Sequence, residues 1–139
     1  MKHKTALMIG RFQPFHKGHL YLLKESLKVA DRVIIGIGSA NIYDVNNPID
    51  WQTRAKILKA VVYKEKLEKQ LQDIVPLNDF FNDKKWLKNI QVKIGTFDAV
   101  VGNNDWVNRI MTKAGYKVIQ VPYFKRFLYE GEKIRKLIN

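Results

Sequence analysis

Apolar residues along the chain occur in short continuous runs that alternate with segments of helical spacing. The continuous runs cover residues 5–9, 32–39, 97–102 and 116–122, with a weaker one at 73–77. Short apolar runs that end at glycine or proline are typical of strands buried on both faces. Because Pro76 has no amide hydrogen, we expect the run at 73–77 to form an edge strand or a strand end.

Four segments between these runs have apolar residues at the spacing of one helix face. The faces are Leu20, Leu23, Leu27 and Ala30; Ala55, Leu58 and Val62; Leu87, Ile90 and Ile94; and Trp106, Ile110 and Ala114 with Val107 and Met111 beside them. Asp50, Asp83 and Asn104 are predicted to cap the helices that follow them, and Gly115 to end one.

This repeated order of strand and helix predicts an α/β fold with about five parallel strands and helices on both faces of the sheet. The 139 residues, 46% of them hydrophobic, suit a single domain over residues 1–139. In such folds ligands bind at the carboxyl ends of the strands, where helix N-termini face the cleft.

Composition narrows the chemistry. The chain has no cysteine, which excludes a thiolate nucleophile, a disulfide framework and sulfur-ligated zinc. Twenty-five Lys and Arg against 13 Asp and Glu give a net charge of +12, which favours anionic partners. The N-terminal apolar run is too short for a signal peptide or a membrane span, so we expect a cytoplasmic protein without membrane contact.

The stretch "IGRFQPFHKGH" joins the first predicted strand to the first helix. Pro14 favours a loop before a helix that starts near His16 to Gly18, so His16 and His19 would lie in its first turn and face one ligand. Gly18 leaves room for an anion beside the helix amides. The stretch therefore predicts a phosphate site.

Other interpretations of this stretch are weaker. Zinc would need more ligands than two histidines, and a Walker A loop fails because Phe15 stands where its second glycine belongs. "GIGSAN" begins like a dinucleotide fingerprint, but Asn41 replaces the third glycine. Helix capping would account for one histidine, and for neither Arg11 nor Gly18.

These residues resemble a known family. "GRFQPFHKGH" is similar to the HxGH region of nucleotidyltransferases, and its first half is most similar to archaeal-type nicotinamide mononucleotide (NMN) adenylyltransferases. The resemblance continues through "IGIGSAN", "NPIDWQTR", "VPLNDFFNDKKWLKNI", "FDAVVGNNDWVNRI" and "YEGEKIRKL". It implies a Rossmann-like nucleotidyltransferase fold that transfers AMP from ATP to NMN, with Mg²⁺, giving NAD and pyrophosphate in NAD biosynthesis.

The resemblance also implies roles for individual residues. Those expected to act in catalysis are Arg11, His16, His19 and Arg135, and those expected to bind ATP are Gly10, Arg11, Phe12, His16, Gly18, His19, Gly131 and Arg135. Gly38, Ser39, Asn82 and Trp86 are expected to bind the acceptor, with Trp86 stacking on nicotinamide. No protein ligand to the metal is assigned. The family often forms homo-oligomers, and the motifs fit the amide and the acid form of the acceptor alike.

The C-terminal motif departs from the family pattern. Glu130 and Glu132 replace two hydroxyl residues before Arg135. An ionised carboxylate repels a phosphate that a hydroxyl would bind. The glutamates could turn outward, help to bind magnesium, or lower the activity. Asn46 stands where the family often has an arginine.

Some residues and functions stay open at this point. Trp51 and Trp106 are expected in the core or an interface, while Arg54 suits a phosphate contact and a solvated helix position about equally. Alternatives to the leading function are a related enzyme using phosphopantetheine or FMN and a degenerate nucleotide-binding protein. Nucleic-acid binding would rest on charge alone, because no recognition motif is present.

Overall fold

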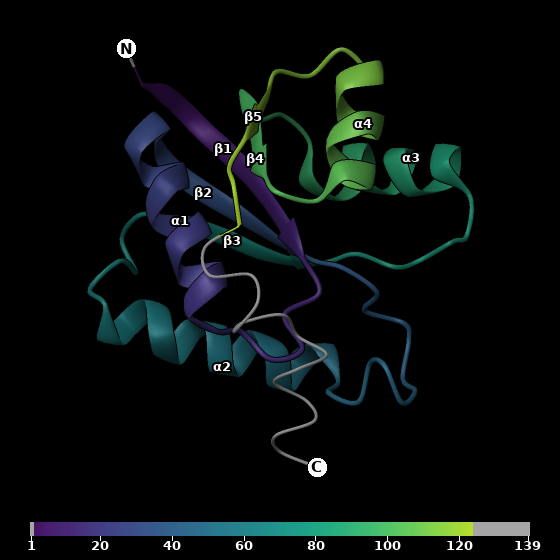
Figure 1. Cartoon of the computed structure of the whole chain (residues 1–139), viewed down its shortest axis with the longest axis horizontal. Coiled ribbons are helices and arrows are strands. Elements are labelled where there is room, and N and C mark those ends of the chain that lie inside the picture. The colour runs from purple at the N-terminus through teal and green to yellow at the C-terminus, as the bar shows by residue number, and fades with distance from the viewer. Residues whose placement is uncertain (1, 124–139) are drawn as a thin grey trace.

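The computed structural model describes residues 2–123 as a five-stranded parallel sheet between two pairs of helices (Figure 1). The strands are β1 (His3–Gly10), β2 (Ala30–Ile37), β3 (Leu71–Pro76), β4 (Ala99–Gly102) and β5 (Val118–Gln120). The helices are α1 (Lys17–Val29), α2 (Trp51–Lys64), α3 (Asp83–Ile94) and α4 (Asp105–Lys113). The predicted α/β class and the parallel sheet are confirmed.

The strand order is β3-β2-β1-β4-β5, so the chain winds outward from β1 in both directions. β1 pairs along its length with β2, from His3 opposite Ala30 to Gly10 opposite Ile37. β3 lies at one edge of the sheet, as Pro76 predicts. The carboxyl ends of β1, β2 and β4 therefore meet at one rim, which lies next to the N-terminus of α1 (Figure 1).

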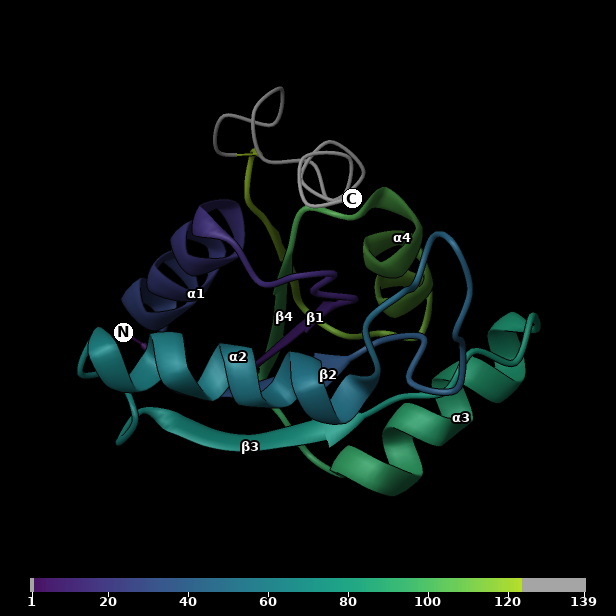
Figure 2. The same cartoon turned by 90° about the horizontal axis from the view of Figure 1, so that it is seen from below.

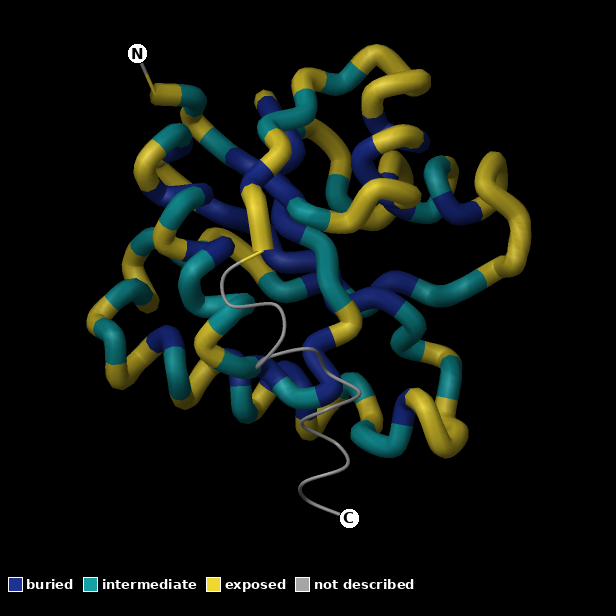
Figure 3. The backbone as a smooth tube through the Cα atoms, in the orientation of Figure 1, coloured by how far each residue is buried: buried dark blue, intermediate teal, exposed yellow. Residues whose placement is uncertain are grey.

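Two apolar clusters hold the layers together. α1 and α2 cover one face of the sheet and α3 and α4 the other, as Figure 2 shows. Side chains of β1 alternate between them: Ala6 and Met8 pack under α1 and α2, while Leu7 packs under α3 and α4. The central strands are the most deeply buried part of the chain (Figure 3).

The predicted helix ends are mostly correct. Asp50 and Asn104 cap α2 and α4, and Gly115 follows the end of α4 with a φ of +94°. The cap of α3 is Asn82 rather than Asp83, because the Asn82 side chain accepts the Lys85 amide and Asp83 begins the helix. No helix within residues 2–123 is long and apolar enough to cross a membrane.

Candidate active site

The turn after β1 is tightly folded around Phe12. Phe12 has a φ of +54° and is 1% exposed. A Cβ on Gly10 would lie 2.7 Å from the Phe12 ring, so only glycine fits there. The buried Phe12 ring thus packs directly against Gly10 at the end of β1.

His16 and His19 form a reciprocal cap at the N-terminus of α1. The Gly18 amide donates to His16 Nδ1 at 3.0 Å, and the His16 amide donates to His19 Nδ1 at 3.1 Å. The two rings stack with their centroids 3.8 Å apart. A neutral imidazole whose Nδ1 accepts a hydrogen bond carries its proton on Nε2. The cap thus sets both histidines in the form that donates from Nε2.

The surroundings keep both rings neutral. Burial lowers the pKa of His16 from 6.5 to about 4. Burial, together with the neighbouring His16, holds the pKa of His19 well below 6.5. Near neutral pH the pair can therefore donate hydrogen bonds to an anion without carrying charge.

This geometry corrects two expectations from the sequence. Capping involves both histidines and not one of them. The Gly18 amide, expected to face an anion, is engaged by His16 Nδ1. The Nδ1 atoms of both histidines are therefore used in the cap. If these histidines bind a ligand, they do so through Nε2.

Two hollows open at the rim. The first, of about 180 Å³, lies beside His19 and is lined by Ile9, Gly10, Arg11, Phe12, Gln13, His19, Leu22, Asn103, Asn104 and Tyr123. The second, of about 160 Å³, lies beside Trp86 and is lined by Ile9, Gly10, Arg11, Gly38, Ser39, Asp79, Trp86, Asn104, Trp106 and Val107. Because Ile9, Gly10, Arg11 and Asn104 line both, the two hollows meet at the end of β1.

The second hollow has an aromatic wall. The rings of Trp86 and Trp106 lie 4.8 Å apart at 56°, and Trp86 is only 5% exposed. Trp106, expected in the core or an interface, is 39% exposed and lines this hollow.

Trp51 packs, half-buried, against the core beneath α2. Gly38 and Ser39, which the resemblance assigns to the acceptor, also line the second hollow. Asn82 lies outside its lining and is exposed, with its side chain engaged in the cap of α3.

Side-chain amides tie the loops of the rim together. Gln13, 2% exposed, donates to the Ile49 carbonyl and accepts the Ile49 amide. Asn41 forms the same double contact with the backbone of Asp79. Sequence reasoning missed both ties, since glutamine and asparagine in polar loops carry no periodic pattern.

Arg54 fits neither interpretation that the sequence allowed. It is 0% exposed and donates to the backbone carbonyls of Arg11, Gly38 and Ser39. A helical position four residues before Leu58 and eight before Val62 places it on the apolar face of α2, and this spacing could have revealed its burial. The structure brings it to the rim as a backbone ligand, not as a surface cation.

Several expected site residues cannot be placed. Gly131, Arg135, Glu130 and Glu132 lie outside the described residues. Within residues 2–123, no group of three or more His, Asp or Glu side chains could hold a metal ion.

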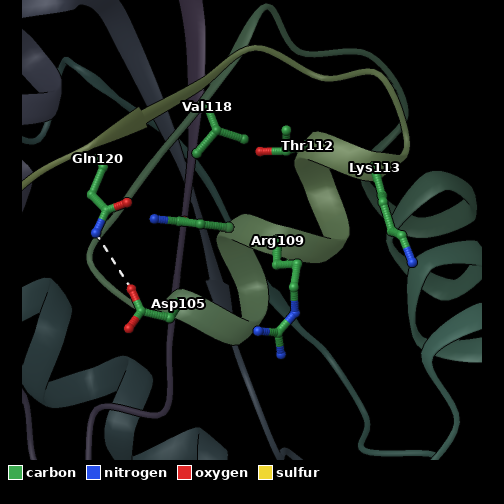
Figure 4. A pocket seen from close by; sticks show the side chains of 7 residues that line it. Asp105, Arg109, Thr112, Lys113, Val118 and Gln120 are labelled. Atoms are coloured by element: carbon green, nitrogen blue, oxygen red, sulfur yellow. Dashed lines mark hydrogen bonds between the residues drawn. The ribbon is translucent and has the colours of Figure 1, made fainter.

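A larger hollow, of about 420 Å³, lies between α4 and β5 (Figure 4). Its labelled side chains include Arg109 and Lys113 on α4, while Gln120 donates to Asp105. It lacks the residues that the sequence singled out, so the rim remains the candidate active site.

Comparisons with known proteins point to the same chemistry. A family model described as cytidylyltransferase-like matches residues 7–136. A nicotinamide-nucleotide adenylyltransferase of Thermoplasma acidophilum is 37% identical over 136 residues, which is 97% of this chain and 75% of the relative. One of Ignicoccus hospitalis is 34% identical over 134 residues, 96% of this chain and 78% of the relative.

Solved structures agree. A bifunctional NMN adenylyltransferase/ADP ribose pyrophosphatase from Francisella tularensis superposes with a TM-score of 0.83 at 27% identity, over 97% of this chain. This chain spans 42% of that protein's length. The same enzyme complexed with AMP and a manganese ion gives a TM-score of 0.80 at 28% identity, over 97% of this chain and 41% of that one.

Proposed function

Because this chain belongs to the cytidylyltransferase-like family and, within it, to the nicotinamide-nucleotide adenylyltransferases, we propose that it transfers AMP from ATP to NMN, giving NAD and pyrophosphate. The observation that carries the proposal is the pair of hollows that meet at Arg11, one beside His19 and one beside Trp86. The reaction joins two anionic substrates, so it needs two adjacent sites with cations and donors at their junction.

The hollow beside His19 is proposed to hold the ATP phosphates. Arg11 would contribute charge there, and His16 and His19 their Nε2 protons. Gly10 and Phe12 line this hollow, whereas His16 and Gly18 lie outside its lining at the N-terminus of α1. Gly131 and Arg135 would complete the site from outside the described residues. This assignment follows the resemblance of "GRFQPFHKGH", and the neutral Nε2 donors of the two histidines support it.

The hollow beside Trp86 is proposed to hold the acceptor. Gly38 and Ser39 would contact its sugar phosphate, and Trp86 would meet the nicotinamide ring together with Trp106. Asn82 would act through the start of α3, whose cap it forms.

The proposed step needs no general base. The phosphate of NMN is largely ionised near pH 7, so its oxygen attacks the α-phosphorus of ATP directly. One P–O bond forms to NMN as the bond to pyrophosphate breaks. Charge that builds on the phosphoryl oxygens in between is stabilised by Arg11 and the histidine Nε2–H groups. Positioning and charge stabilisation, which this rim can supply, dominate transfers of this kind.

Magnesium is a further part of the proposal. Residues 2–123 present no cluster that could hold the ion. The ATP phosphates would hold it, alone or with Glu130 and Glu132, which lie outside the described residues. A single domain over residues 1–139, assembly of the chain into a homo-oligomer and a cytoplasmic location also remain proposals. None of the described helices is long and apolar enough to span a membrane.

Product analysis tests the function directly. Purified protein is incubated with ATP and magnesium and, in parallel, with NMN, its acid form, FMN or phosphopantetheine, and dinucleotides and pyrophosphate are quantified. NAD should form fastest with NMN. Another dinucleotide without NAD would identify a different acceptor, and ATP binding without pyrophosphate release would identify a nucleotide-binding protein.

A further inference from the structure

The guanidinium of Arg54 is buried where the turns after β1 and β2 come together. Its Nη1 donates to the carbonyl oxygens of Arg11 and Gly38, each at 2.8 Å, and its Nη2 to that of Ser39 at 3.2 Å. Arg11 belongs to the turn that leads to His16, and Gly38 and Ser39 to the wall of the acceptor hollow. One side chain thus holds the backbone on both sides of the rim.

Both turns contain a strained backbone position. Phe12 has a φ of +54° and Ser39 a φ of +51°, in the left-handed region that residues other than glycine rarely adopt. Arg54 binds the carbonyl directly before Phe12 and the carbonyl of Ser39 itself. Such conformations persist only where the surroundings fix them. The Arg54 side chain donates hydrogen bonds to both turns.

The charge of Arg54 has few compensating groups. Its three bonded partners are neutral carbonyls, and within residues 2–123 its Nε finds no acceptor. Burial lowers the pKa of Arg54 to about 10, Asp50 opposes this change, and the nearby Arg11 adds to it. Arg54 therefore stays protonated at neutral pH, close to a second cation that lines both hollows.

We propose that Arg54 is a positioning residue that fixes the strained turns at Phe12 and Ser39 and so sets Arg11 between the two substrates. The inference rests on the adenylyl transfer proposed above. Arg54 acts through the backbone of Arg11, Gly38 and Ser39 and not by contact with the reacting phosphates. Its hydrogen bonds orient three carbonyls at once, which a lysine ammonium cannot reproduce because it lacks the planar fork of donors.

A positioning role and a purely structural role of Arg54 predict different values of kcat for a variant that is folded. If Arg54 only stabilised the fold, a variant that stays folded at the assay temperature would keep its kcat. If it sets the geometry of the turns, the folded variant loses kcat, because small displacements of catalytic groups lower the rate of a positioned reaction on the order of 100-fold. The KM values should change less than kcat.

The experiment compares Arg54→Lys and Arg54→Ala with the exposed α2 control Lys56→Ala. Circular dichroism selects a temperature at which each variant is folded, and kcat and both KM values are measured there. Arg54→Lys should lose about 100-fold in kcat, and millimolar guanidinium should restore part of the activity of Arg54→Ala but none to His19→Ala. Lys56→Ala should match the wild type.

The outcomes separate the two proposals. Wild-type protein that forms no NAD contradicts the proposed function. Active wild type with a folded Arg54→Lys variant whose kcat lies within twofold overturns the positioning role. Loss of stability without loss of kcat in Arg54→Lys, or no rescue of folded Arg54→Ala by guanidinium, also overturns it.

Discussion

His19 combines two functions in one ring, and two substitutions can separate them. Its Nδ1 accepts the His16 amide at 3.1 Å, which caps α1, while its Nε2 carries the proton proposed to meet the ATP phosphates. Asparagine can place an oxygen near the position of Nδ1 but has no atom at Nε2. Glutamine can place an NH₂ group near Nε2 but leaves the cap. His19→Asn therefore keeps the cap, and His19→Gln keeps the donor.

The size of each effect follows from the contacts. Loss of one helix-cap hydrogen bond costs about 1 kcal/mol of the free energy of unfolding. Loss of one donor to developing charge costs about 100-fold to 1,000-fold in kcat. Both variants lose the contacts of the His19 ring with Phe12 and Phe15, so the difference in stability between them reports on the cap. His19→Asn should turn over at least about 100-fold more slowly than the wild type. His19→Gln should be about 1 kcal/mol less stable than His19→Asn and retain more of its kcat.

Urea unfolding and initial rates of NAD formation measure the two quantities on the same preparations. The KM for NMN should change little in either variant, because His19 lines the hollow assigned to ATP. His19→Ala serves as the reference that loses both functions. Wild-type turnover in His19→Asn would refute the donor role, and equal stability of His19→Asn and His19→Gln would refute the contribution of the cap.

Two further predictions concern pH and the aromatic wall. The pKa of His16 is about 4 in the folded protein and near 6.5 in the unfolded chain, so the unfolded state binds more protons between these pH values. The free energy of unfolding, measured in urea, should therefore fall as the pH drops from 6.5 to 4. His16→Asn should make this pH dependence less steep. Trp106→Ala should raise the KM for NMN more than it lowers kcat, because Trp106 lines the hollow assigned to the acceptor. NMN should quench the tryptophan fluorescence of Trp106→Ala less than that of the Trp51→Phe control. An unchanged KM would place Trp106 outside the acceptor site.

The arrangement of the chain was largely predictable from local pattern. Continuous apolar runs identified all five strands. The signal is clearest for β1, β2 and β4, whose central residues are buried and leave no polar alternation. Pro76 correctly indicated an edge strand, and Pro14 correctly delayed the start of α1 to the residues after the loop. The approximate position of the rim followed, since the ends of parallel strands coincide.

The interior of the site was less predictable. Trp86 was expected to stack on nicotinamide; in the structure Trp106 packs against it, and only 5% of Trp86 is exposed. This contact joins α3 and α4, so the spacing of apolar residues within either helix could not predict it. Arg54 was misjudged for a related reason. Its spacing to Leu58 places it on the buried face, but the carbonyls that compensate its burial come from two turns that precede it in the chain.

The charge of the proposed substrates explains why Asn47 and Arg54 both form hydrogen bonds with Arg11 in the turn after β1. Both proposed substrates are anions, and bringing them together costs Coulomb energy unless cations lie between them. Arg11 lines both hollows, and Asn47 holds its guanidinium by accepting from Nη1 at 3.2 Å while Arg54 holds its carbonyl. Arg54 lowers that cost further, because its buried charge is less screened than a surface lysine's. Burial and, to a lesser degree, repulsion from Arg11 lower the pKa of Arg54, and the phosphates of the proposed substrates would offset that repulsion.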